Sequence, residues 1–277
     1  MSVSTPYLDF ADGHRIPQLG LGVYKVDTGI AEQLVDGALR LGYRHVDTAK
    51  LYRNEAEVGR GVRSSGVARD DVFVTTKVWD DDQGFDQTLR AAERSLAELD
   101  LGYIDLYLIH WPCPAQDLYV DTWRALQRLR DEGVVKSIGV SNFHPHHIER
   151  LIAETGEKAV INQVELHPRL PQHTTRAFDA EHGILTQSWA PLGRGTVLDE
   201  PVLAEIAARH GRTPAQVVIR WHLQQGLVVI PKSNSLDRIR QNLEVFDFEL
   251  DAHDLAAIAT LETGERTGMD PDLHEPK

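Results

Sequence analysis

The sequence predicts an α/β protein with the architecture of a (β/α)8 barrel, in a single domain with additional helices. Short apolar, β-branched runs alternate with amphipathic stretches along the chain, as expected for parallel strands covered by helices. Eight such units follow one another without a Pro/Gly/Ser-rich linker, and a length of 277 residues suits one closed barrel. We therefore expect one barrel domain over residues 1–277.

The expected strands are near-continuous apolar runs, which is typical of parallel strands buried on both faces. They cover residues 17–24, 43–48, 71–79, 103–111, 135–142, 159–165, 184–190 and 227–233.

The expected helices each follow one strand and carry an apolar stripe. In the third helix Leu89, Ala92, Leu96 and Leu99 recur at helical spacing, and charges fill the other face. The helices cover residues 30–42, 54–65, 85–99, 118–133, 144–155, 174–183, 200–211 and 235–246, with an additional helix at 213–226. Residues 264–277 are expected to form an irregular loop.

Charge and composition exclude several classes of partner. The net charge of −13 argues against nucleic acid and against an anionic membrane surface. No apolar run approaches the roughly 18 residues of a membrane span, and the N-terminus lacks the features of a signal peptide. The single cysteine, Cys113, excludes an intramolecular disulfide and fits a reducing compartment. We expect a cytoplasmic protein.

Polar side chains stand where the predicted strands end. Because the carboxyl ends of barrel strands share the face that holds the active site, these side chains should converge in one cleft. They are Asp47, Lys77, His110, Ser141, Asn142, Gln163, Glu165, Ser188, Lys232 and Ser233.

Three of these residues also have ordinary structural interpretations. Asp47 fits a helix N-cap, Lys77 a lysine that reaches the surface, and His110 a neutral core histidine. Their occurrence at three successive strand ends instead favours one pocket. In that pocket Asp47 would hold Lys77 charged, and Lys77 would lower the pKa of Tyr52. Tyr52 would then act as a general acid toward a carbonyl oxygen positioned by His110.

Five motifs, in this order along the chain, resemble the signatures of the aldo-keto reductases, and most of all the prokaryotic 2,5-diketo-D-gluconate reductase branch. They are GYRHVDTAKLYRNE (42–55), VTTKVW (74–79), LIHWP (108–112), IGVSNF (138–143) and IPKS (230–233). The resemblance implies an NADPH-dependent enzyme, without a metal, that reduces aldehydes or ketones to alcohols. It implies a catalytic tetrad of Asp47, Tyr52, Lys77 and His110 with Tyr52 as proton donor, sugar-derived or α-dicarbonyl substrates, and a monomer.

The sequence has no G-x-G-x-x-G motif between a strand and a helix, so a Rossmann cofactor site is not expected. The cofactor contacts therefore follow from the resemblance alone. Ser141, Asn142 and Gln163 would hold the carboxamide. Trp189, where many relatives have tyrosine, would stack on the nicotinamide ring. The further contacts implied on this side are Gly22, Val23, Tyr24, Pro191 and Leu192.

The segment 231–242 concentrates Lys232, Arg238 and Arg240 in an otherwise acidic chain. A solvated helix face is the ordinary interpretation. The other is a clamp for the 2′-phosphate and pyrophosphate, with Ser233 or Ser235 near a helix N-terminus. The resemblance assigns this clamp to Lys232, Ser233, Arg238 and Asn242, and places Gln241, usually glutamate in relatives, near the adenine.

On the substrate side, Tyr24, Trp79 and Trp111 are expected to form an aromatic wall beside Tyr52 and His110. The motif HPHH (144–147) is interpreted as a helix start with surface histidines, because no further ligand stands at a fixed spacing for a metal. Glu165 and His167 are expected to be structural, and Cys113 receives no role.

Two other functions remain open on the same scaffold. An aldolase-type lyase would use Lys77 as a Schiff-base nucleophile. A nicotinamide-sensing subunit would bind NADPH with negligible turnover.

Overall fold

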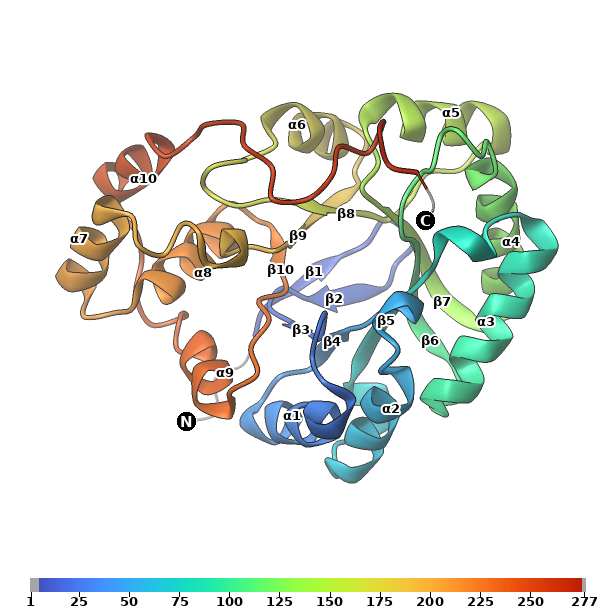
Figure 1. Ribbon diagram of the computed structural model, residues 1–277, viewed down its shortest axis with the longest axis horizontal. Coiled ribbons are helices and arrows are strands. Elements are labelled where there is room, and N and C mark those ends of the chain that lie inside the picture. Colours follow the sequence, from blue (N-terminus) through green and yellow to red (C-terminus); the bar gives the residue numbers. More distant parts are fainter. Residues whose placement is uncertain (1–4, 276–277) are drawn as a thin grey trace.

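The computed structural model describes residues 5–275, and eight parallel strands form its central sheet (Figure 1). Each strand pairs with its neighbours along the chain in the order β10-β9-β8-β7-β6-β5-β4-β3. The strands are β3 (Leu21–Gly22), β4 (His45–Asp47), β5 (Phe73–Val78), β6 (Ile104–Ile109), β7 (Val135–Ser141), β8 (Ile161–Glu165), β9 (Leu185–Trp189) and β10 (Val228–Val229).

The sheet closes into a barrel where its first and last strands meet. The amide of Gly20 donates to the carbonyl of Val229 at 2.9 Å, and the amide of Val229 donates to the carbonyl of Gln18 at 2.8 Å. The (β/α)8 prediction is therefore confirmed. Both closing strands are shorter than expected, and Pro231, which has no N–H to donate, follows shortly after β10.

The helices surround the barrel, as Figure 1 shows. They are α1 (Thr28–Leu41), α2 (Glu55–Ser64), α3 (Phe85–Leu99), α4 (Tyr119–Asp131), α5 (Pro145–Thr155), α6 (His173–Glu181), α7 (Pro201–His210), α8 (Pro214–Gln224), α9 (Leu236–Leu243) and α10 (Ala252–Ala259). None of the helices in residues 5–275 combines the length and apolar character that crossing a membrane requires.

Helix boundaries follow local chemistry. The Asp27 side chain accepts from the amide of Gly29 at 2.8 Å and begins α1, which ends at Gly42 in the left-handed region (φ 117°). Thr213 and Gln216 form a capping box at the additional helix α8. Helix α10 was not predicted from the sequence, although Asp251 and Asp254 form the same kind of box at its start.

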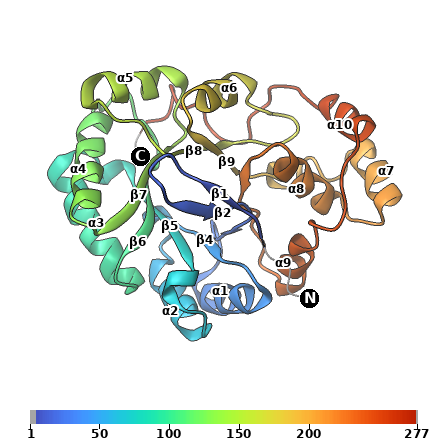
Figure 2. The same ribbon diagram turned by 180° about the vertical axis from the view of Figure 1, so that it is seen from behind.

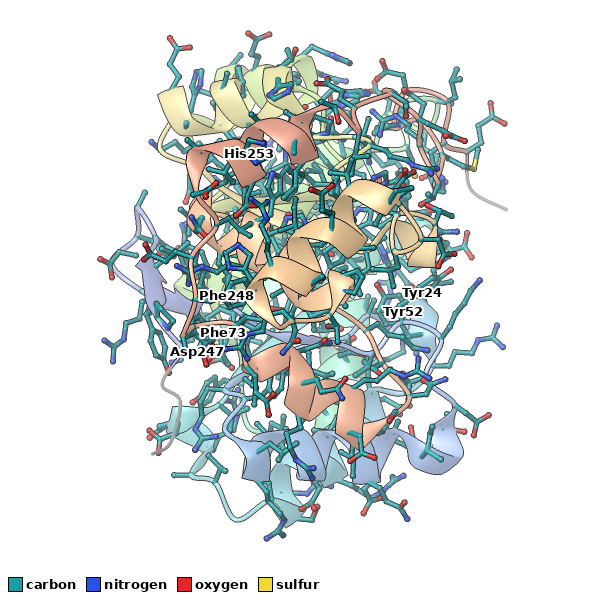
Figure 3. All side chains as sticks on the ribbon, turned by 90° about the vertical axis from the view of Figure 1, so that its left-hand side faces the viewer. Tyr24, Tyr52, Phe73, Asp247, Phe248 and His253 are labelled. Carbon is teal, nitrogen blue, oxygen red and sulfur yellow. The ribbon has the colours of Figure 1, made fainter. Side chains whose placement is uncertain are left out.

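A hairpin of β1 (Tyr7–Asp9) and β2 (Arg15–Pro17), also missed, covers the amino-terminal end of the barrel (Figure 2). Phe10 and Ile16 of this segment are buried against Leu106 and Leu108 of β6. Figure 3 places Tyr24 and Tyr52 at one end of the molecule and Phe73, which begins β5, at the other. The hairpin thus seals one end, and the carboxyl ends of the strands carry the site at the other.

The C-terminal segment 264–275 is irregular, as expected, but it is firmly attached; residues 276 and 277 lie outside the described part. The buried Glu165 carboxylate accepts from the amides of Thr267 and Gly268, at 2.6 and 2.9 Å. Burial alone would raise the pKa of Glu165, but hydrogen bonds from His167, Thr267 and Gly268 lower it to about 2. The expected structural role of Glu165 and His167 is thus to anchor this segment.

Candidate active site

Asp47 and Lys77 stand side by side in the barrel, because β4 and β5 pair and both residues lie near the ends of these strands. The Lys77 side chain is fully buried, and its Nζ donates to Asp47 Oδ1 at 2.6 Å and to the Thr48 carbonyl at 2.8 Å. A 3-10 turn over Lys50–Tyr52 brings the phenol back, so that Lys77 Nζ lies 3.5 Å from Tyr52 Oη. Asp47 therefore orients the lysine, and the lysine faces the phenol.

The pKa of Tyr52 differs from the expectation. Burial and the Asp47 carboxylate raise the pKa of Tyr52 well above its ordinary value, so the predicted lowering is wrong. Burial is the larger cause, since it disfavours a charged phenolate. In addition Asp47, which lies much closer to Lys77 than the phenol does, offsets the lysine's charge. The phenol consequently carries its proton at neutral pH, as a proton donor must.

His110 follows β6 and is buried in the same place, with its ring edge-on to that of Tyr52 at a centroid distance of 5.9 Å. Burial, with the positive charge of Lys77, lowers the pKa of His110 well below its ordinary value. The imidazole is therefore neutral at pH 7. A neutral imidazole carries one N–H, which can donate to a substrate oxygen without adding charge.

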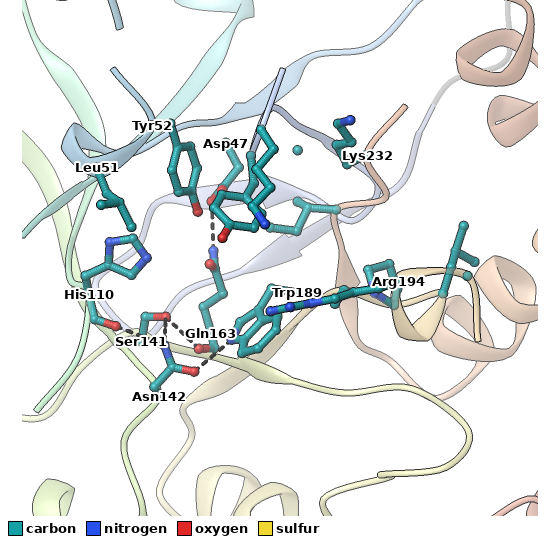
Figure 4. Close-up of a pocket in the computed structure, with 18 of the residues that line it drawn as sticks. Asp47, Leu51, Tyr52, His110, Ser141, Asn142, Gln163, Trp189, Arg194 and Lys232 are labelled. Atoms are coloured by element: carbon teal, nitrogen blue, oxygen red, sulfur yellow. Dashed lines mark hydrogen bonds between the residues drawn. The ribbon is translucent and has the colours of Figure 1, made fainter. Parts of the chain in front are cut away.

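Three residues predicted to hold the carboxamide form one hydrogen-bonded network (Figure 4). Ser141 Oγ donates to the carbonyl of Gln163 at 2.9 Å, and Gln163 Nε2 donates to Asp47 Oδ2 at 2.7 Å. The Trp189 indole N–H donates to Asn142 Oδ1 at 2.8 Å, which fixes the plane of the indole. The network thus ties the predicted nicotinamide side directly to the tetrad.

A cavity of about 500 Å³ runs over these residues and contains most of the predicted site. Of the tetrad, Asp47, Tyr52 and His110 line it, whereas Lys77 lies beneath, fully buried. The other predicted residues on its wall are Gly22, Tyr24, Trp111, Ser141, Asn142, Gln163, Trp189, Pro191, Leu192, Lys232 and Arg238.

Besides Lys77, five predicted site residues do not line the cavity. Val23, Ser233 and Asn242 are buried in the surrounding structure, and Gln241 is exposed on α9. Trp79 packs edge-on against His110 at a centroid distance of 5.0 Å. The glycine-rich LGRG (192–195) indicates a loop after β9, but seven residues of the wall were not predicted from the sequence: Lys25, Leu51, Ala190, Arg194, Gly195, Leu198 and Ile230.

Lys232 and Arg238 form a positive rim at the cavity edge. Both are exposed, and neither makes a salt bridge within residues 5–275, whereas the neighbouring Arg240 contacts Asp237 at 3.4 Å. Partial burial and the Arg238 guanidinium lower the pKa of Lys232. Two neighbouring cations without carboxylate partners in so acidic a chain fit phosphate groups of a ligand.

The predicted aromatic wall is present in part. Tyr24 packs against Tyr52 at a ring distance of 5.0 Å, and Trp111 stacks on His274 of the C-terminal segment at 4.2 Å. His274 Nε2 in turn lies 2.6 Å from Asp80 Oδ2. The position of His274 could not be predicted from the sequence, because an irregular segment has no periodic pattern that would place it.

The HPHH motif begins α5, as expected, but not all its histidines are at the surface. His147 is buried, since its ring packs against Phe143 at 5.6 Å. His144 lies 3.3 Å from Asp270, and His146 3.2 Å from Asp272. These contacts attach the C-terminal segment a second time.

A closed (β/α)8 barrel with a cavity at the carboxyl ends of its strands, lined by Asp47, Tyr52 and His110, has the arrangement of a barrel enzyme. The model of the Aldo/keto reductase family matches residues 18–263. An aldo-keto reductase of Mycolicibacterium smegmatis is 52% identical over 96% of this chain and 97% of the relative. A methylglyoxal reductase, DkgA, of Escherichia coli is 49% identical over 94% and 95% of the two chains.

Solved structures agree with these relatives. A crystal structure of a Gox0644 variant in complex with NADPH superposes with a TM-score of 0.95, at 49% identity, over 98% of this chain and 99% of that one. The aldo-keto reductase of Brucella melitensis gives a TM-score of 0.92 at 48% identity, over 95% and 100% of the chains. This chain belongs to the aldo/keto reductase family.

Proposed function

We propose that this chain is a monomeric, single-domain NADPH-dependent reductase that converts aldehydes and ketones to alcohols. The observation that carries the proposal is the buried Lys77–Asp47 pair beneath Tyr52, beside a cavity that is also lined by Lys232 and Arg238, two cations without a salt bridge within residues 5–275. The NADPH complex of the 49% identical structure supports the choice of cofactor.

The residues present fit this cofactor. Lys232 and Arg238 would hold its phosphates, and the fixed indole of Trp189 offers a flat face for the nicotinamide ring. Asn142 accepts from the indole N–H, and Ser141 and Gln163 belong to the same hydrogen-bonded network. When bound, NADPH supplies the hydride for the carbonyl carbon.

The chain's own residues supply the proton and the orientation. The Tyr52 phenol, protonated at neutral pH, donates its proton from Oη to the carbonyl oxygen as negative charge develops there. Lys77 Nζ, 3.5 Å away, stabilises the phenolate that remains, and Asp47 holds the lysine in place. The neutral His110 ring positions the carbonyl oxygen by a hydrogen bond.

For the substrate we propose small α-dicarbonyl or sugar-derived carbonyl compounds. The E. coli relative is named a methylglyoxal reductase, and methylglyoxal is an α-dicarbonyl. The cavity wall near Tyr52 combines the aromatic rings of Tyr24 and Trp111, which suits a small, partly apolar carbonyl. NADPH oxidation measured across methylglyoxal, sugars and aromatic aldehydes tests this, and faster turnover of aromatic aldehydes would contradict it.

The geometry argues against a Schiff-base lyase. A nucleophilic lysine must reach the substrate, but Lys77 is fully buried, does not line the cavity and is held by Asp47 and Thr48. Borohydride treatment with methylglyoxal and no cofactor should therefore leave Lys77 unmodified. A stable adduct on Lys77, found by peptide mass spectrometry, would contradict the reductase proposal, whereas NADPH binding without turnover would favour a sensor.

A further inference from the structure

We propose that Asp80, Cys113 and His274 form a zinc-binding site next to the candidate active site. Asp80 follows β5, Cys113 follows β6, and His274 lies in the C-terminal segment. One potential ligand atom from each lies within 4.8 Å of the other two, and all three side chains are buried. None of the three lines the cavity described above, so this site is separate from the reductase centre.

The donor set points to zinc. A thiolate, an imidazole and a carboxylate are the three kinds of protein ligand that Zn²⁺ takes, whereas calcium and magnesium select oxygen alone. Ligand atoms of one tetrahedral zinc stand about 3.5 Å apart, given bond lengths of about 2.0–2.3 Å. The three candidate ligand atoms lie within 4.8 Å of one another, and His274 Nε2 and Asp80 Oδ2, now 2.6 Å apart, would have to separate slightly to share one ion.

Unused polar atoms are the independent evidence for a ligand. Asp80 and His274 contact each other through Oδ2 and Nε2 at 2.6 Å, but Asp80 Oδ1 and His274 Nδ1 have no hydrogen-bond partner within residues 5–275, although the two residues are only 1% and 8% exposed. Gln83 Oε1 is buried without a partner as well, while its amide nitrogen donates to the Trp111 carbonyl at 2.8 Å. Because buried polar atoms rarely lack partners, this cluster has capacity for an ion, with Gln83 or water in the fourth position.

The proposed zinc site lies next to the wall of the substrate cavity. The His274 ring stacks on Trp111 at 4.2 Å with an interplanar angle of 14°, and Trp111 lines the cavity. A zinc ion held by Asp80 and Cys113 of the barrel and by His274 would fix the end of the C-terminal segment against this wall. The inference does not depend on the proposed activity, since its test measures binding.

Cobalt provides a direct test, because Cys113 is the only cysteine in the chain. A sulfur-to-cobalt charge-transfer band in the near ultraviolet therefore reports a bond to Cys113 and to no other residue. We expect one equivalent of Co²⁺ added to the full-length protein to produce this band, and one equivalent of Zn²⁺ to abolish it. Absence of the band in the wild-type protein would overturn the proposal.

Variants separate this site from surface binding. Cys113→Ala should abolish the cobalt band and weaken Zn²⁺ binding, measured by calorimetry, by more than the roughly tenfold that even outer-shell changes cause. His274→Gln should weaken it similarly. His146→Ala is the matched control, because His146 and Asp272 are exposed and form, with the buried His147, a cluster of similar spacing. This variant should bind zinc as the wild type does.

Thermal unfolding gives a second measurement that does not need the spectroscopic band. Zn²⁺ should raise the Tm of the wild type and of His146→Ala but not that of Cys113→Ala, because only a metal bound to the folded state stabilises it. Wild-type zinc affinity in Cys113→Ala or in His274→Gln would overturn the proposal. Zinc binding that depends on His146 alone would indicate an adventitious surface ion and would overturn it too.

Discussion

At the residue scale, the proposed reaction requires Tyr52 to keep its proton at neutral pH and to release it when negative charge develops on the carbonyl oxygen. The raised pKa of Tyr52 keeps the phenol protonated at neutral pH. The Lys77 ammonium, 3.5 Å away, stabilises the phenolate that forms when the proton leaves. Tyr52→Phe keeps the ring that packs on Tyr24 but removes the proton. We expect carbonyl reduction to fall by about 10²–10⁴-fold, the usual contribution of a general acid.

NADPH binding, followed by nicotinamide fluorescence, should survive in Tyr52→Phe. Tyr103→Phe removes a hydroxyl that bonds Asp70 at the surface and is the control for the same chemical change elsewhere. Undiminished turnover in Tyr52→Phe would exclude Tyr52 as the acid.

Arg238 and Arg240 allow a matched comparison on one helix. Arg238 is unpaired within residues 5–275 and lines the cavity, whereas Arg240 contacts Asp237 and does not line it. We expect Arg238→Ala to raise the KM for NADPH much more than that for NADH, because only NADPH carries the 2′-phosphate. Arg240→Ala should change both little. Equal effects of Arg238→Ala on the two cofactors would place the 2′-phosphate elsewhere.

At the element scale, α2 packs against the end of α3 through a glycine. A Cβ on Gly59 would lie 1.9 Å from the backbone oxygen of Leu99, which cannot move without distorting α3. Gly59→Ala should therefore lower the free energy of unfolding by about 1–3 kcal/mol, although alanine is the better helix former.

Gly37→Ala in α1 is the control for this substitution. Its Cβ would meet only the Leu236 side chain, which is 38% exposed and free to rotate. Urea unfolding of both variants should show the loss in Gly59→Ala alone. Equal stabilities would mean that α2 and α3 adjust to each other more freely than their backbone contact implies.

Asp179 joins α6 to β9 and is fully buried. Thr186 Oγ donates to its Oδ2 at 2.8 Å, but burial raises the pKa of Asp179 to about 7. A folded-state pKa above the ordinary value of 3.8 means that this group's stabilising contribution is complete below pH 3.8 and is lost as the pH rises to about 7.

The Asp179→Asn side chain cannot ionise, so this variant should not lose stability at this site as the pH rises to about 7. Relative to the wild type, we expect the variant to gain of the order of 1–4 kcal/mol in unfolding free energy as the pH rises through this range. Urea unfolding at several pH values measures the difference. A difference that does not change with pH would show that Asp179 has an ordinary pKa.

At the scale of the whole molecule, the repeating pattern of strand and helix was enough to predict the barrel and the convergence of Asp47, Lys77 and His110. It could not predict the β1–β2 hairpin, whose strands of three residues are too short for a periodic signal. The pKa of Tyr52 was also mispredicted, since its sign depends on burial and on two distances that residue order does not contain.

The attachment of the C-terminal segment could not be predicted from the sequence either. Its attachment relies on Glu165, about a hundred positions earlier, so that no local pattern indicated it. Only some of the residues predicted to clamp the cofactor phosphates line the cavity. Lys232 and Arg238 reach the cavity, whereas Ser233 and Asn242, from the same short stretch, are buried beside it because successive helix and loop positions face different sides.

Attachment of the C-terminal segment makes a prediction for the stability of the whole molecule. The pKa of Glu165 is about 2, below its ordinary value of 4.5, so its contribution is complete above pH 4.5 and is lost as the pH falls toward 2. Glu165→Gln cannot accept all the hydrogen bonds from Thr267 and Gly268. At pH 7 it should be about 1–3 kcal/mol less stable than the wild type.

This difference between wild type and Glu165→Gln should shrink on acidification below pH 4.5, because the wild-type carboxylate then becomes protonated in the unfolded chain first. Urea unfolding between neutral and acid pH measures it. Glu262→Gln is the control: Glu262 lies at the surface 3.3 Å from His173, and its replacement should cost little at any pH. A deficit in Glu165→Gln that stays constant with pH would show that Glu165 acts through packing and not through its charge.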